Sequence, residues 1–484
     1  MQLIYEKSVS GRRGVGLPVS DVPAAQPLPE TLLRTESAEL PELSELDLVR
    51  HFTNLSRRNF SVDTNFYPLG SCTMKYNPKV LEECATLFEG FHPLLALLPG
   101  GEELCQGTLG MLYDLGQLLA DITGMDEVTT QPLAGAQGEM TGIMLIAAYH
   151  RARGNRKKYV LVPDSSHGTN PASAAMAGYE IITVPTAPYG DMDLELFRQA
   201  MNGEVAAVMM TCPNTLGLFN PHIKEISDIA HAHDALMYYD GANLNAIMGK
   251  VKPGDIGFDV VHVNLHKTFA TPHGGGGPGA GPVGVRRALI PYLPLPRICM
   301  DDGGKLFLET SSAHSIGRTA GFFGNFGVLA RAYAYIVMLG REGLIRVSEQ
   351  AVLNANYIRV RLKEYYDLPF DMTCMHECVF SASRQLPHGV RAIDIAKYLI
   401  DHGFHPPTVY FPMIVKEAIM IEPTETESKA TLDSFIGVMI EAAELAGSNP
   451  QALHDAPLSM PVSRLDETKA AREQKVCCEG ERAR

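Results

Sequence analysis

Six short apolar runs recur in the middle of the sequence, and several of them are separated by stretches with a helical pattern. None of the runs alternates between apolar and polar residues, as a strand with one solvent-exposed face does. Strands that are buried on both faces have this pattern, so the series predicts a mostly parallel sheet covered by helices on both sides. The runs are Tyr159–Val162, Ile181–Val184, Val205–Met210, Leu236–Tyr239, Val260–Val263 and Pro282–Val285.

The size and charge of the chain exclude several other classes of protein. With 484 residues, of which 45% are apolar and 20% charged, the chain has enough length for two or three domains and lacks the composition of a disordered protein. Its net charge of −14 disfavours general binding to nucleic acid. No apolar run approaches about 18 residues, so we expect no membrane span.

The cysteines and the N-terminal residues indicate a cytoplasmic protein. Nine cysteines, an odd number spread along the chain, are more typical of reduced thiols than of a disulfide framework. Residues 1–17 include Lys7, Arg12 and Arg13 but no apolar segment of the kind that a secretory signal contains. Cys477 and Cys478 near the end of the sequence suggest no role.

Changes in pattern along the chain predict four parts. Prolines punctuate residues 1–95, which we expect to form an arm with a short helix at Glu42–Leu55. Residues 96–330 contain the apolar runs and form the expected large, cofactor-binding domain. Residues 331–448 form an expected smaller α+β domain, and residues 449–484 a charged tail with little helix. The further elements predicted are helices at Leu104–Ile122, Gly138–Arg151, Ile223–His233, Val328–Tyr366 and Ala392–His402 and a strand at Val379–Ala382.

Polar or ionisable residues directly follow four of the predicted strands. They include His167, Thr211, Asp240 and Lys267. Ligands of an open parallel sheet bind beyond the carboxyl ends of its strands, so these side chains are expected to meet at one edge. Each residue alone carries little information, and it is their shared position that predicts a site.

Lys267 is the candidate nucleophile of this site. A lysine whose charge is disfavoured by an apolar wall and by a neighbouring His266 can form an imine with a carbonyl group. Most lysines are instead solvated surface residues. The glycine-rich segment 274–281 favours the imine because glycines let the backbone approach a cofactor closely. No Gly-Lys-Ser or Gly-Lys-Thr ends the segment, which argues against the P-loop of an NTPase.

Three further features suit pyridoxal phosphate, and each has an ordinary structural alternative. Asp240 could hold the proton on the pyridine nitrogen, or it could cap a helix or a turn. His167 could stack on the ring or be a polar loop residue. The segment Ala134–Glu139 opens a helix whose N–H groups suit a phosphate, although glycine-rich turns before helices are common.

Cys374, His376 and Cys378 form the one cluster that suggests a metal. Their spacing is poor for zinc, and no second pair of cysteines or histidines lies near in the sequence. We therefore interpret the two cysteines as buried thiols beside a strand, and we expect no metal.

Four segments resemble the glycine dehydrogenase (decarboxylating) family, the P-protein of the glycine cleavage system. The most specific is Asn264–Gly284, which is similar to the family's cofactor-lysine motif. Ala270 and Ala280 stand where many members have serine, and both are small enough to leave the chemistry undisturbed. The other segments are Tyr67–Pro78, Asp164–Ala174 and Tyr239–Asn245, and the resemblance extends over nearly the whole chain up to about Ser448.

The resemblance implies a fold and an assembly. The fold is the aspartate-aminotransferase-like fold type I of pyridoxal phosphate enzymes, an α/β structure with a mostly parallel sheet of the seven-stranded type and a smaller α+β C-terminal domain. Members occur as one long chain or as two, and a chain of 484 residues with the lysine resembles the second, β, subunit. The implied partners are an α subunit that lacks the lysine, in an α2β2 complex, and the lipoylated H-protein.

The resemblance also implies a reaction and roles for residues. Lys267 would bind pyridoxal 5'-phosphate, and glycine would lose CO2 while its aminomethyl group passes to the lipoyl arm of the H-protein. Asp240 would face the ring nitrogen and His167 would stack on the ring. The phosphate and the surroundings of the lysine would involve Ala136, Gln137, Gly138, Thr211, Ala242, Asn264 and His266. The substrate would contact Arg318, Tyr67 and Lys75.

Two other functions fit the same residues. A decarboxylase or aminotransferase for a larger amino acid shares the fold and the lysine, so the fold cannot separate it from a glycine decarboxylase, whereas dependence on a lipoylated carrier would. A non-catalytic assembly subunit is the second alternative. It has no need of both Lys267 and Asp240, and a colourless complex without cofactor would favour it.

Overall fold

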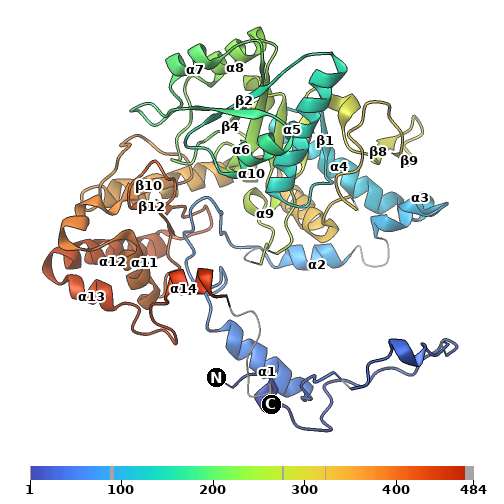
Figure 1. Cartoon of the computed structure of the whole chain (residues 1–484), viewed down its shortest axis with the longest axis horizontal. Coiled ribbons are helices and arrows are strands. Elements are labelled where there is room, and N and C mark those ends of the chain that lie inside the picture. The colour runs from blue at the N-terminus through green and yellow to red at the C-terminus, as the bar shows by residue number, and fades with distance from the viewer. Residues whose placement is uncertain are drawn as a thin grey trace. The chain divides into compact units, whose positions relative to one another are not determined.

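The computed structural model of the chain describes residues 2–24, 26–36, 38–87, 92–274, 277–321 and 323–474 (Figure 1). The chain divides into two compact units, Met1–Ser61 and Val62–Arg484. The domain borders expected at residues 95, 330 and 448 stay predictions. Cys477 and Cys478 lie outside the described residues.

Among the described residues of the first unit there is one α-helix, α1 (Glu45–Ser56). The side chain of Ser44 caps its start by accepting the Asp47 N–H at 3.2 Å, and the charge of Asp47 suits the first turn of a helix. Asp47 also pairs with Arg12 at 3.1 Å, which ties the preceding segment to the helix. The predicted helix Glu42–Leu55 is confirmed, and its first turn begins three residues later because Ser44 supplies the cap.

The second unit is built on a seven-stranded sheet with strand order β1-β7-β6-β5-β4-β2-β3. Strands β2 to β6 run parallel to their neighbours, whereas β7 is antiparallel to both β6 and β1. The predicted mostly parallel sheet is therefore confirmed. The strands are β1 (Glu127–Thr129), β2 (Tyr159–Pro163), β3 (Glu180–Val184), β4 (Val205–Thr211), β5 (Leu236–Gly241), β6 (Val260–Val263) and β7 (Val283–Val285).

Alternate residues of the central strands enter two different cores. Met237 and Tyr239 of β5 belong to the core on one face, and Leu236 and Tyr238 belong to the core on the other. Both faces are dry, which explains why the apolar runs do not alternate in polarity. Figure 1 shows helices on both sides of the sheet. One face is covered by α5 (Gly135–Ala152) and α6 (Thr169–Met176), and the other by α4 (Gln106–Thr123), α7 (Leu194–Ala200), α8 (Ile223–Ala232) and the first part of α10 (Phe326–Leu362).

The C-terminal region has its own antiparallel sheet and core. The sheet has the order β10-β12-β11 and packs with three helices and the end of α10. Leu453 and Ala456 are buried in this core, so the prediction of a tail with little helix is wrong for the residues just after 448. The elements are β10 (Cys378–Ser381), β11 (Thr408–Val409), β12 (Ala418–Ile421), α11 (Ala392–Asp401), α12 (Lys429–Ser448), α13 (Pro450–Asp455) and, farther on, the exposed α14 (Glu467–Arg472).

Helix α10 is broken once. Gly340 has φ 57° and ψ −175°, a conformation that a residue with a Cβ adopts only at a cost. The sequence predicted one continuous helix, Val328–Tyr366, because the apolar pattern continues through the break.

Several short elements escaped prediction. Strand β1 has three residues, and a hairpin formed by β8 (Arg297–Met300) and β9 (Leu306–Glu309) lies apart from the main sheet. Helices α2 (Val80–Thr86), α3 (Gly101–Leu104) and α9 (Leu265–Thr268) are also short. Among the described residues, no helix is both long and apolar enough to cross a membrane.

Close packing of α5 against the sheet gives a stability prediction. A Cβ added to Gly142 would overlap the ring of Tyr238, so Gly142→Ala should lower the free energy of unfolding by about 1–3 kcal/mol. The matched control is Gly437→Ala in α12, where nothing lies within 4 Å of the added Cβ and a gain of about 0.4–1 kcal/mol is expected. Urea unfolding of the whole chain measures both changes. Equal effects of the two substitutions would contradict the packing seen for α5.

Candidate active site

Polar side chains from four parallel strands meet at the carboxyl edge of the main sheet. Thr211 is the last residue of β4 and lies in register with Asp240 of β5. The loop after β2 carries His167, and β6 leads directly into the short helix α9, which carries Lys267. The edge predicted from the sequence as a ligand site is therefore present.

Asp240 is buried, and both oxygens of its carboxylate accept hydrogen bonds. Thr211 Oγ1 and Asn170 Nδ2 each donate to Oδ2 at 3.2 Å, and the Ala242 N–H donates to Oδ1 at 3.0 Å. Burial by itself would raise the pKa of Asp240, but the charge of His262 and the Ala242 N–H outweigh it, so this pKa is lowered. Asp240 is consequently an anion at neutral pH.

A group of buried titratable side chains surrounds Asp240. His262 Nε2 lies 3.4 Å from Asp240 Oδ1, and His262 Nδ1 pairs with the Tyr238 hydroxyl at 2.8 Å. One carboxylate oxygen of Glu139 completes the group, whose three ligand atoms lie within 4.8 Å of one another. Burial and then the charge of Asp240 raise the pKa of Glu139. The two carboxyl groups therefore carry one negative charge between them, and it resides on Asp240.

His167 is linked to this group through one hydroxyl. Its Nδ1 lies 2.7 Å from Thr169 Oγ1, which in turn donates to Glu139 Oε1 at 2.9 Å. The imidazole is exposed, and its centre lies 6.2 Å from that of the Phe411 ring. The ring is thus held by its edge while a face stays available for stacking.

Lys267 is the third residue of α9 and is partly buried. The carbonyl of Asn264 starts this helix by accepting the N–H groups of Lys267 and Thr268, both at 3.1 Å. His266 accepts the Ala280 N–H on Nδ1 at 3.3 Å, and burial followed by the charge of Lys267 lowers the pKa of His266 to about 4. His266 is uncharged at neutral pH, so it does not add the positive charge expected beside the lysine.

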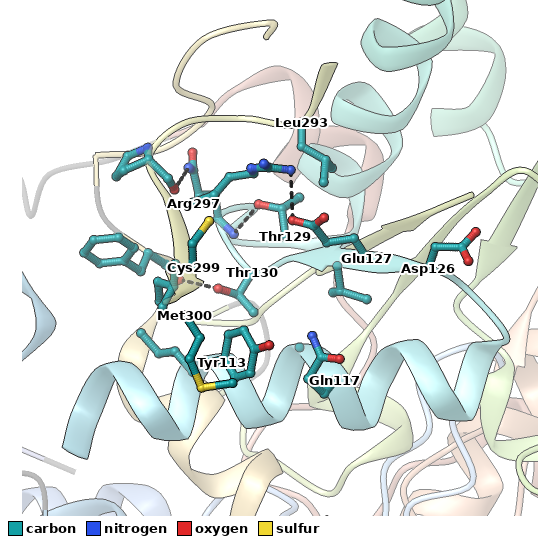
Figure 2. Close-up of a pocket in the computed structure, with 17 residues that line it drawn as sticks. Tyr113, Gln117, Asp126, Glu127, Thr129, Thr130, Leu293, Arg297, Cys299 and Met300 are labelled. Atoms are coloured by element: carbon teal, nitrogen blue, oxygen red, sulfur yellow. Dashed lines mark hydrogen bonds and ion pairs between the residues drawn. The ribbon is translucent and has the colours of Figure 1, made fainter. Parts of the chain in front are cut away.

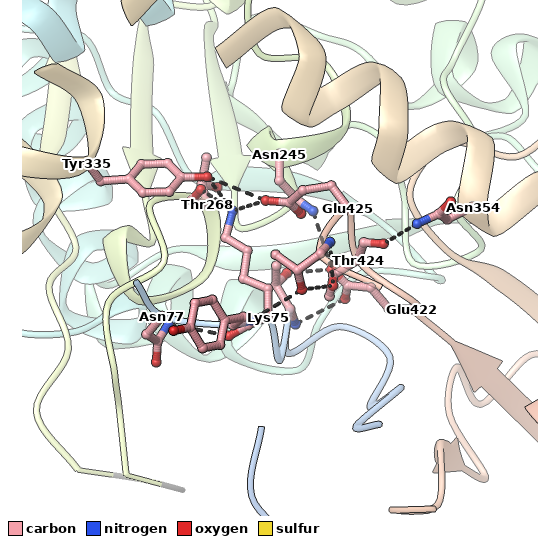
Figure 3. A network of polar contacts seen from close by, with 12 residues as sticks. Lys75, Asn77, Asn245, Thr268, Tyr335, Asn354, Glu422, Thr424 and Glu425 are labelled. Carbon is pink, nitrogen blue, oxygen red and sulfur yellow. Dashed lines mark hydrogen bonds and ion pairs between the residues drawn. The ribbon is translucent and has the colours of Figure 1, made fainter. Parts of the chain in front are cut away.

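Lys75 supports the end of the helix that carries Lys267. Its buried ammonium donates to the Thr268 carbonyl at 2.6 Å, to Glu425 Oε1 at 2.7 Å and to the Tyr335 hydroxyl at 3.3 Å (Figure 3). These contacts use all three N–H groups of the ammonium. Lys75 therefore holds the backbone next to the nucleophile, which differs from the substrate contact that the sequence predicted.

The N-terminus of α5 is open at the same edge. No side chain caps this helix of 18 residues, and Ala136 in its first turn is exposed. Glycine is required behind it: a Cβ on Gly135 would lie 2.5 Å from Asn264 Oδ1, and one on Gly138 would lie 2.8 Å from the Gly281 carbonyl. The free N–H groups and the helix dipole make this end suitable for an anion.

The side chain of Gln137 shapes the turn before α5. Its Oε1 accepts the Leu133 N–H at 2.7 Å, and its Nε2 donates to the Thr319 carbonyl at 2.6 Å. Gln137 can therefore offer an anion its backbone N–H, because its side chain is already bonded at both ends.

Two other predicted substrate residues lie in different surroundings. Tyr67 stacks on His405, with ring centres 3.6 Å apart and an interplanar angle of 12°. Arg318 is exposed and donates to the Gly321 carbonyl at 3.4 Å. Its neighbour Thr319 contacts Gln137, so Arg318 belongs to the α5 end of the site. The substrate contacts of Tyr67 and Arg318 stay predictions.

A second group of buried titratable side chains comes from the C-terminal region. His376 and Glu377 precede β10, and Glu422 follows β12. One ligand atom from each lies within 4.8 Å of the others, and the charge of Lys267 influences all three. The neighbouring Cys374 and Cys378 are buried free thiols, which confirms that part of the sequence interpretation.

Sequence reasoning missed four members of these groups, Glu139, His262, Glu377 and Glu422, and it considered His376 only as a possible metal ligand. The available signal was a charged or ionisable residue inside or beside an apolar run, as at His262 within Val260–Val263. Such residues are rarely buried without a partner, and this makes them candidates even when no motif marks them.

A cavity of about 260 Å³ lies elsewhere, between α4, β1 and β8. Figure 2 shows its polar wall, where Arg297 pairs with Glu127 at 3.0 Å, and Arg297 also pairs with Glu309 at 2.6 Å. None of the predicted site residues lines this cavity. The site predicted at the carboxyl edge of the sheet is therefore separate from this cavity.

Comparison with known proteins agrees with this geometry. A model of the aminotransferase class-V family matches residues 137–289, and a model of the glycine dehydrogenase C-terminal domain matches residues 347–455. A crystal structure of glycine decarboxylase (P-protein) of the glycine cleavage system superposes with a TM-score of 0.70 at 20% identity, covering 86% of this chain and 93% of that one. A cysteine desulfurase from Thermococcus onnurineus superposes with a TM-score of 0.61 at 17% identity, covering 78% and 95%.

These matches define the class of protein: the chain has the aminotransferase class-V fold, fold type I of the pyridoxal-phosphate-dependent enzymes. Curated relatives are more specific. A probable glycine dehydrogenase (decarboxylating) subunit 2 of Listeria innocua is 56% identical over 98% of this chain and 97% of its own length. One from Bacillus licheniformis is 56% identical over 97% of each chain. The chain belongs to the glycine dehydrogenase (decarboxylating) subunit 2 family.

The buried Lys75–Glu425 ion pair gives a second stability prediction. Lys75→Met leaves the carboxylate of Glu425 buried without its cation, so the free energy of unfolding should fall by about 3–5 kcal/mol. The double variant Lys75→Met/Glu425→Gln removes both charges and should recover more than half of the loss. Urea unfolding of the whole chain measures both variants. A double variant no more stable than Lys75→Met would show that the ion pair is not the source of the effect.

Proposed function

We propose that this chain is the lysine-bearing subunit of a glycine decarboxylase that uses pyridoxal 5'-phosphate and passes an aminomethyl group to the lipoyl arm of the H-protein. The observation that supports the proposal is that the buried Asp240, near the end of β5, and Lys267, in the short helix after β6, follow neighbouring parallel strands at one edge of a fold type I sheet. The charge of Lys267 contributes to the lowered pKa of Asp240, which supports a common space between the two side chains.

The residues at this edge fit the cofactor. Its phosphate suits the uncapped N-terminus of α5, with Ala136, Gln137 and Gly138 in the first turn. Its pyridine nitrogen suits Asp240, and its ring face suits the exposed imidazole of His167. Buried polar atoms without a hydrogen-bond partner among the described residues, Asn264 Oδ1 and Glu139 Oε2, also lie in this region. When bound, pyridoxal phosphate supplies an electron sink for the pair of electrons that CO2 leaves behind.

The side chains at this edge have separate roles in binding and orienting the cofactor. Lys267 supplies the amine that holds the cofactor and that the amino group of glycine replaces. Asp240 keeps the proton on the ring nitrogen, and Glu139, being protonated, leaves that carboxylate as the one anion beside it. Thr211, Asn170 and the Ala242 N–H fix the direction of the Asp240 carboxylate. His266 is uncharged and packs against the glycine-rich segment through Ala280.

The net reaction balances without a further oxidant. The bond between the two carbons of glycine breaks and releases CO2, and a bond forms between the remaining carbon and one lipoyl sulfur. The S–S bond of the lipoyl ring breaks, so the disulfide is reduced and its second sulfur ends as a thiol. Dependence on this carrier distinguishes the proposed function from an aminotransferase of the same fold.

The proposal includes partners and a location. The family name "subunit 2" supports a partner subunit 1, and the assembly we propose is α2β2. The H-protein is the second partner, and we place the complex in the cytoplasm. Tyr67 and Arg318 remain the proposed contacts of the substrate.

Covalent mapping tests the lysine. Borohydride reduction of the complex loaded with pyridoxal phosphate should fix the cofactor to Lys267, and peptide mass spectrometry locates the modified residue. Lys267→Ala should lower the glycine–bicarbonate exchange rate by more than about 10³-fold, because the remaining lysines cannot replace a positioned nucleophile. Lys305→Ala is the control, since Lys305 is exposed and pairs with Glu103 far from the site. A label on another lysine would overturn the assignment.

Asp240→Asn tests the carboxylate. An amide cannot hold the positive charge on the ring nitrogen, so CO2 release from glycine should fall by about 10²–10³-fold while the shape of the site is kept. Asp191→Asn replaces another buried carboxyl group, outside the described surroundings of Lys267, and should leave the rate unchanged. A rate for Asp240→Asn within threefold of the native rate would contradict the role of Asp240.

A further inference from the structure

Two buried carboxyl groups face the active site from the C-terminal region and have no role in the proposed function above. Glu422 accepts the Thr73 hydroxyl at 2.5 Å and Asn245 Nδ2 at 3.3 Å on Oε1, and the Thr73 N–H at 3.1 Å on Oε2. Figure 3 shows Glu422 and Asn245 in this arrangement. Three donors from two different segments are therefore directed at one carboxylate, which stabilises its anionic form.

Glu377 is bonded much less completely. Its Oε2 accepts the Ser71 N–H at 2.8 Å, while Oε1 has no hydrogen-bond partner among the described residues. An ionisable group close to that oxygen is His376, whose Nε2 lies 3.5 Å away. Burial lowers the pKa of His376 to about 3, so the imidazole is uncharged and does not compensate a negative Glu377.

The two carboxyl groups are too close for both to be ionised. Their oxygens lie within 4.8 Å of each other, and neither side chain is exposed to solvent. Burial raises the pKa of both groups, and for Glu377 the charge of Glu422 is the second cause. The donor pattern puts the negative charge mainly on Glu422 and the proton mainly on Glu377.

Hydrogen-bonded segments connect the pair to the surroundings of the nucleophile. Asn245 comes from the loop after β5, five residues beyond Asp240, and Thr73 is two residues before Lys75, which holds the carbonyl of Thr268. The charge of Lys267 stabilises the ionised forms of both Glu377 and Glu422. The pair is therefore on the side of Lys267 formed by the C-terminal region, and Asp240 is on the side formed by the sheet.

We propose that Glu377 and Glu422 share one proton and act together as the counter-ion and proton partner of the Lys267 amine. This inference rests on the proposed function of Lys267. Glycine enters as an ammonium ion, and two of its three N–H bonds would break when its nitrogen takes the place of the Lys267 nitrogen, as the carbon–nitrogen bond to glycine forms and that to Lys267 breaks. One of the two protons would form an N–H bond that leaves Lys267 as a neutral amine, and the other would form an O–H bond on the pair or a further N–H bond on Lys267, so both protons stay inside the site.

Other titratable groups surround Lys267 and must stay unchanged for the pair to be tested. From the sheet and its helices these are Glu139, His167, Asp240, His262 and His266, from the residue before the glycine-rich segment His273, from the segment before α2 Cys72, and from the C-terminal region His376. Asp240 is the other anion of this set, and its charge acts on Lys267 in the native form and in every variant alike.

A divalent cation is the competing occupant of this group. Metal binding needs free lone pairs on the carboxylate oxygens, whereas N–H and O–H donors already point at both oxygens of Glu422 and at one oxygen of Glu377. The positive charge of Lys267 nearby opposes a cation as well. The arrangement of donors favours a proton over a metal ion.

The test compares four forms of the cofactor-free complex: native, Glu377→Gln, Glu422→Gln and the double variant. The measurement is the rate at which acetic anhydride acetylates Lys267 at pH 7, followed by peptide mass spectrometry. Without the pair the amine is uncharged more often, so the double variant should react about tenfold faster, the change that corresponds to one pH unit. Each single variant should react less than threefold faster, because the remaining carboxyl group loses its proton and replaces the missing charge. Asp191→Asn is the control and should react at the native rate.

Each other outcome overturns the proposal. Single variants whose effects multiply to that of the double variant would show two independent carboxylates rather than one shared proton. An unchanged rate in the double variant would show that the pair does not act on Lys267. Added Zn²⁺ or Mg²⁺ that slows acetylation of the native complex, but not of the double variant, would show a metal site. If borohydride instead fixed the cofactor to another lysine, the proposed function would be wrong. The acetylation rates would still report whether the pair acts on the charge of Lys267, so the two failures can be told apart.

Two further readouts keep the test valid if the double variant does not fold. The infrared difference between the native complex and Glu377→Gln at pH 7 should contain the band of one protonated carboxyl group, and its absence would contradict the shared proton. Thr73→Val removes the hydroxyl donor of Glu422, which raises the proton affinity of the pair. It should therefore also speed acetylation of Lys267, by about threefold, and a slower reaction would contradict the proposal.

Discussion

Because both faces of the main sheet are buried, the sheet can hold ionised side chains only at its edges. The side chains of Leu236 to Tyr239 alternate between two dry cores, so neither face can accept an ionised group without a large desolvation cost. Ionised side chains are instead stable at the carboxyl edge, where strand ends, loop N–H groups and the start of α5 supply hydrogen bonds. Asp240 is stable there as an anion because three hydrogen-bond donors compensate its burial.

The same constraint explains why carboxyl groups occur in close pairs around Lys267. In each pair one member is well supplied with donors and the other is not: Asp240 with Glu139, and Glu422 with Glu377. A buried pair of this kind holds one negative charge over a wide range of pH, since the second ionisation is opposed by the first. In the proposed arrangement, Lys267 therefore interacts with two sites of single negative charge, one from the sheet and one from the C-terminal region.

The sequence predicted the part of this structure that depends on local pattern. Strands β2 to β7 and the position of Lys267 followed from apolar runs and from what comes directly after them. The break at Gly340 and the burial of Leu453 did not, because both depend on packing between distant segments. The interior contacts of Lys75 were not predicted for the same reason: no local signal distinguishes a lysine that contacts a substrate from one that binds a carbonyl and Glu425 in the interior.

Of the site itself, the pattern of residues after the strands predicted Lys267, Asp240 and His167, the resemblance implied their roles, and all three follow strands at one edge of the sheet. Glu139, His262, Glu377 and Glu422 were missed because a buried carboxyl group is understood only with its neighbours in space. A single Glu beside a strand is uninformative, whereas two within 4.8 Å restrict each other's charge.

The bond from Lys75 to the Thr268 carbonyl joins residues that are 193 positions apart in the chain. The same ammonium also donates a hydrogen bond to Glu425 of the C-terminal region and one to Tyr335 of α10. The turn that carries the reactive amine is therefore held in its orientation by contacts among four segments that are distant in the sequence. A displacement of the C-terminal region would move Glu425 and, through Lys75, would rotate that turn. The position of the C-terminal region and the direction of the Lys267 side chain are therefore mechanically coupled.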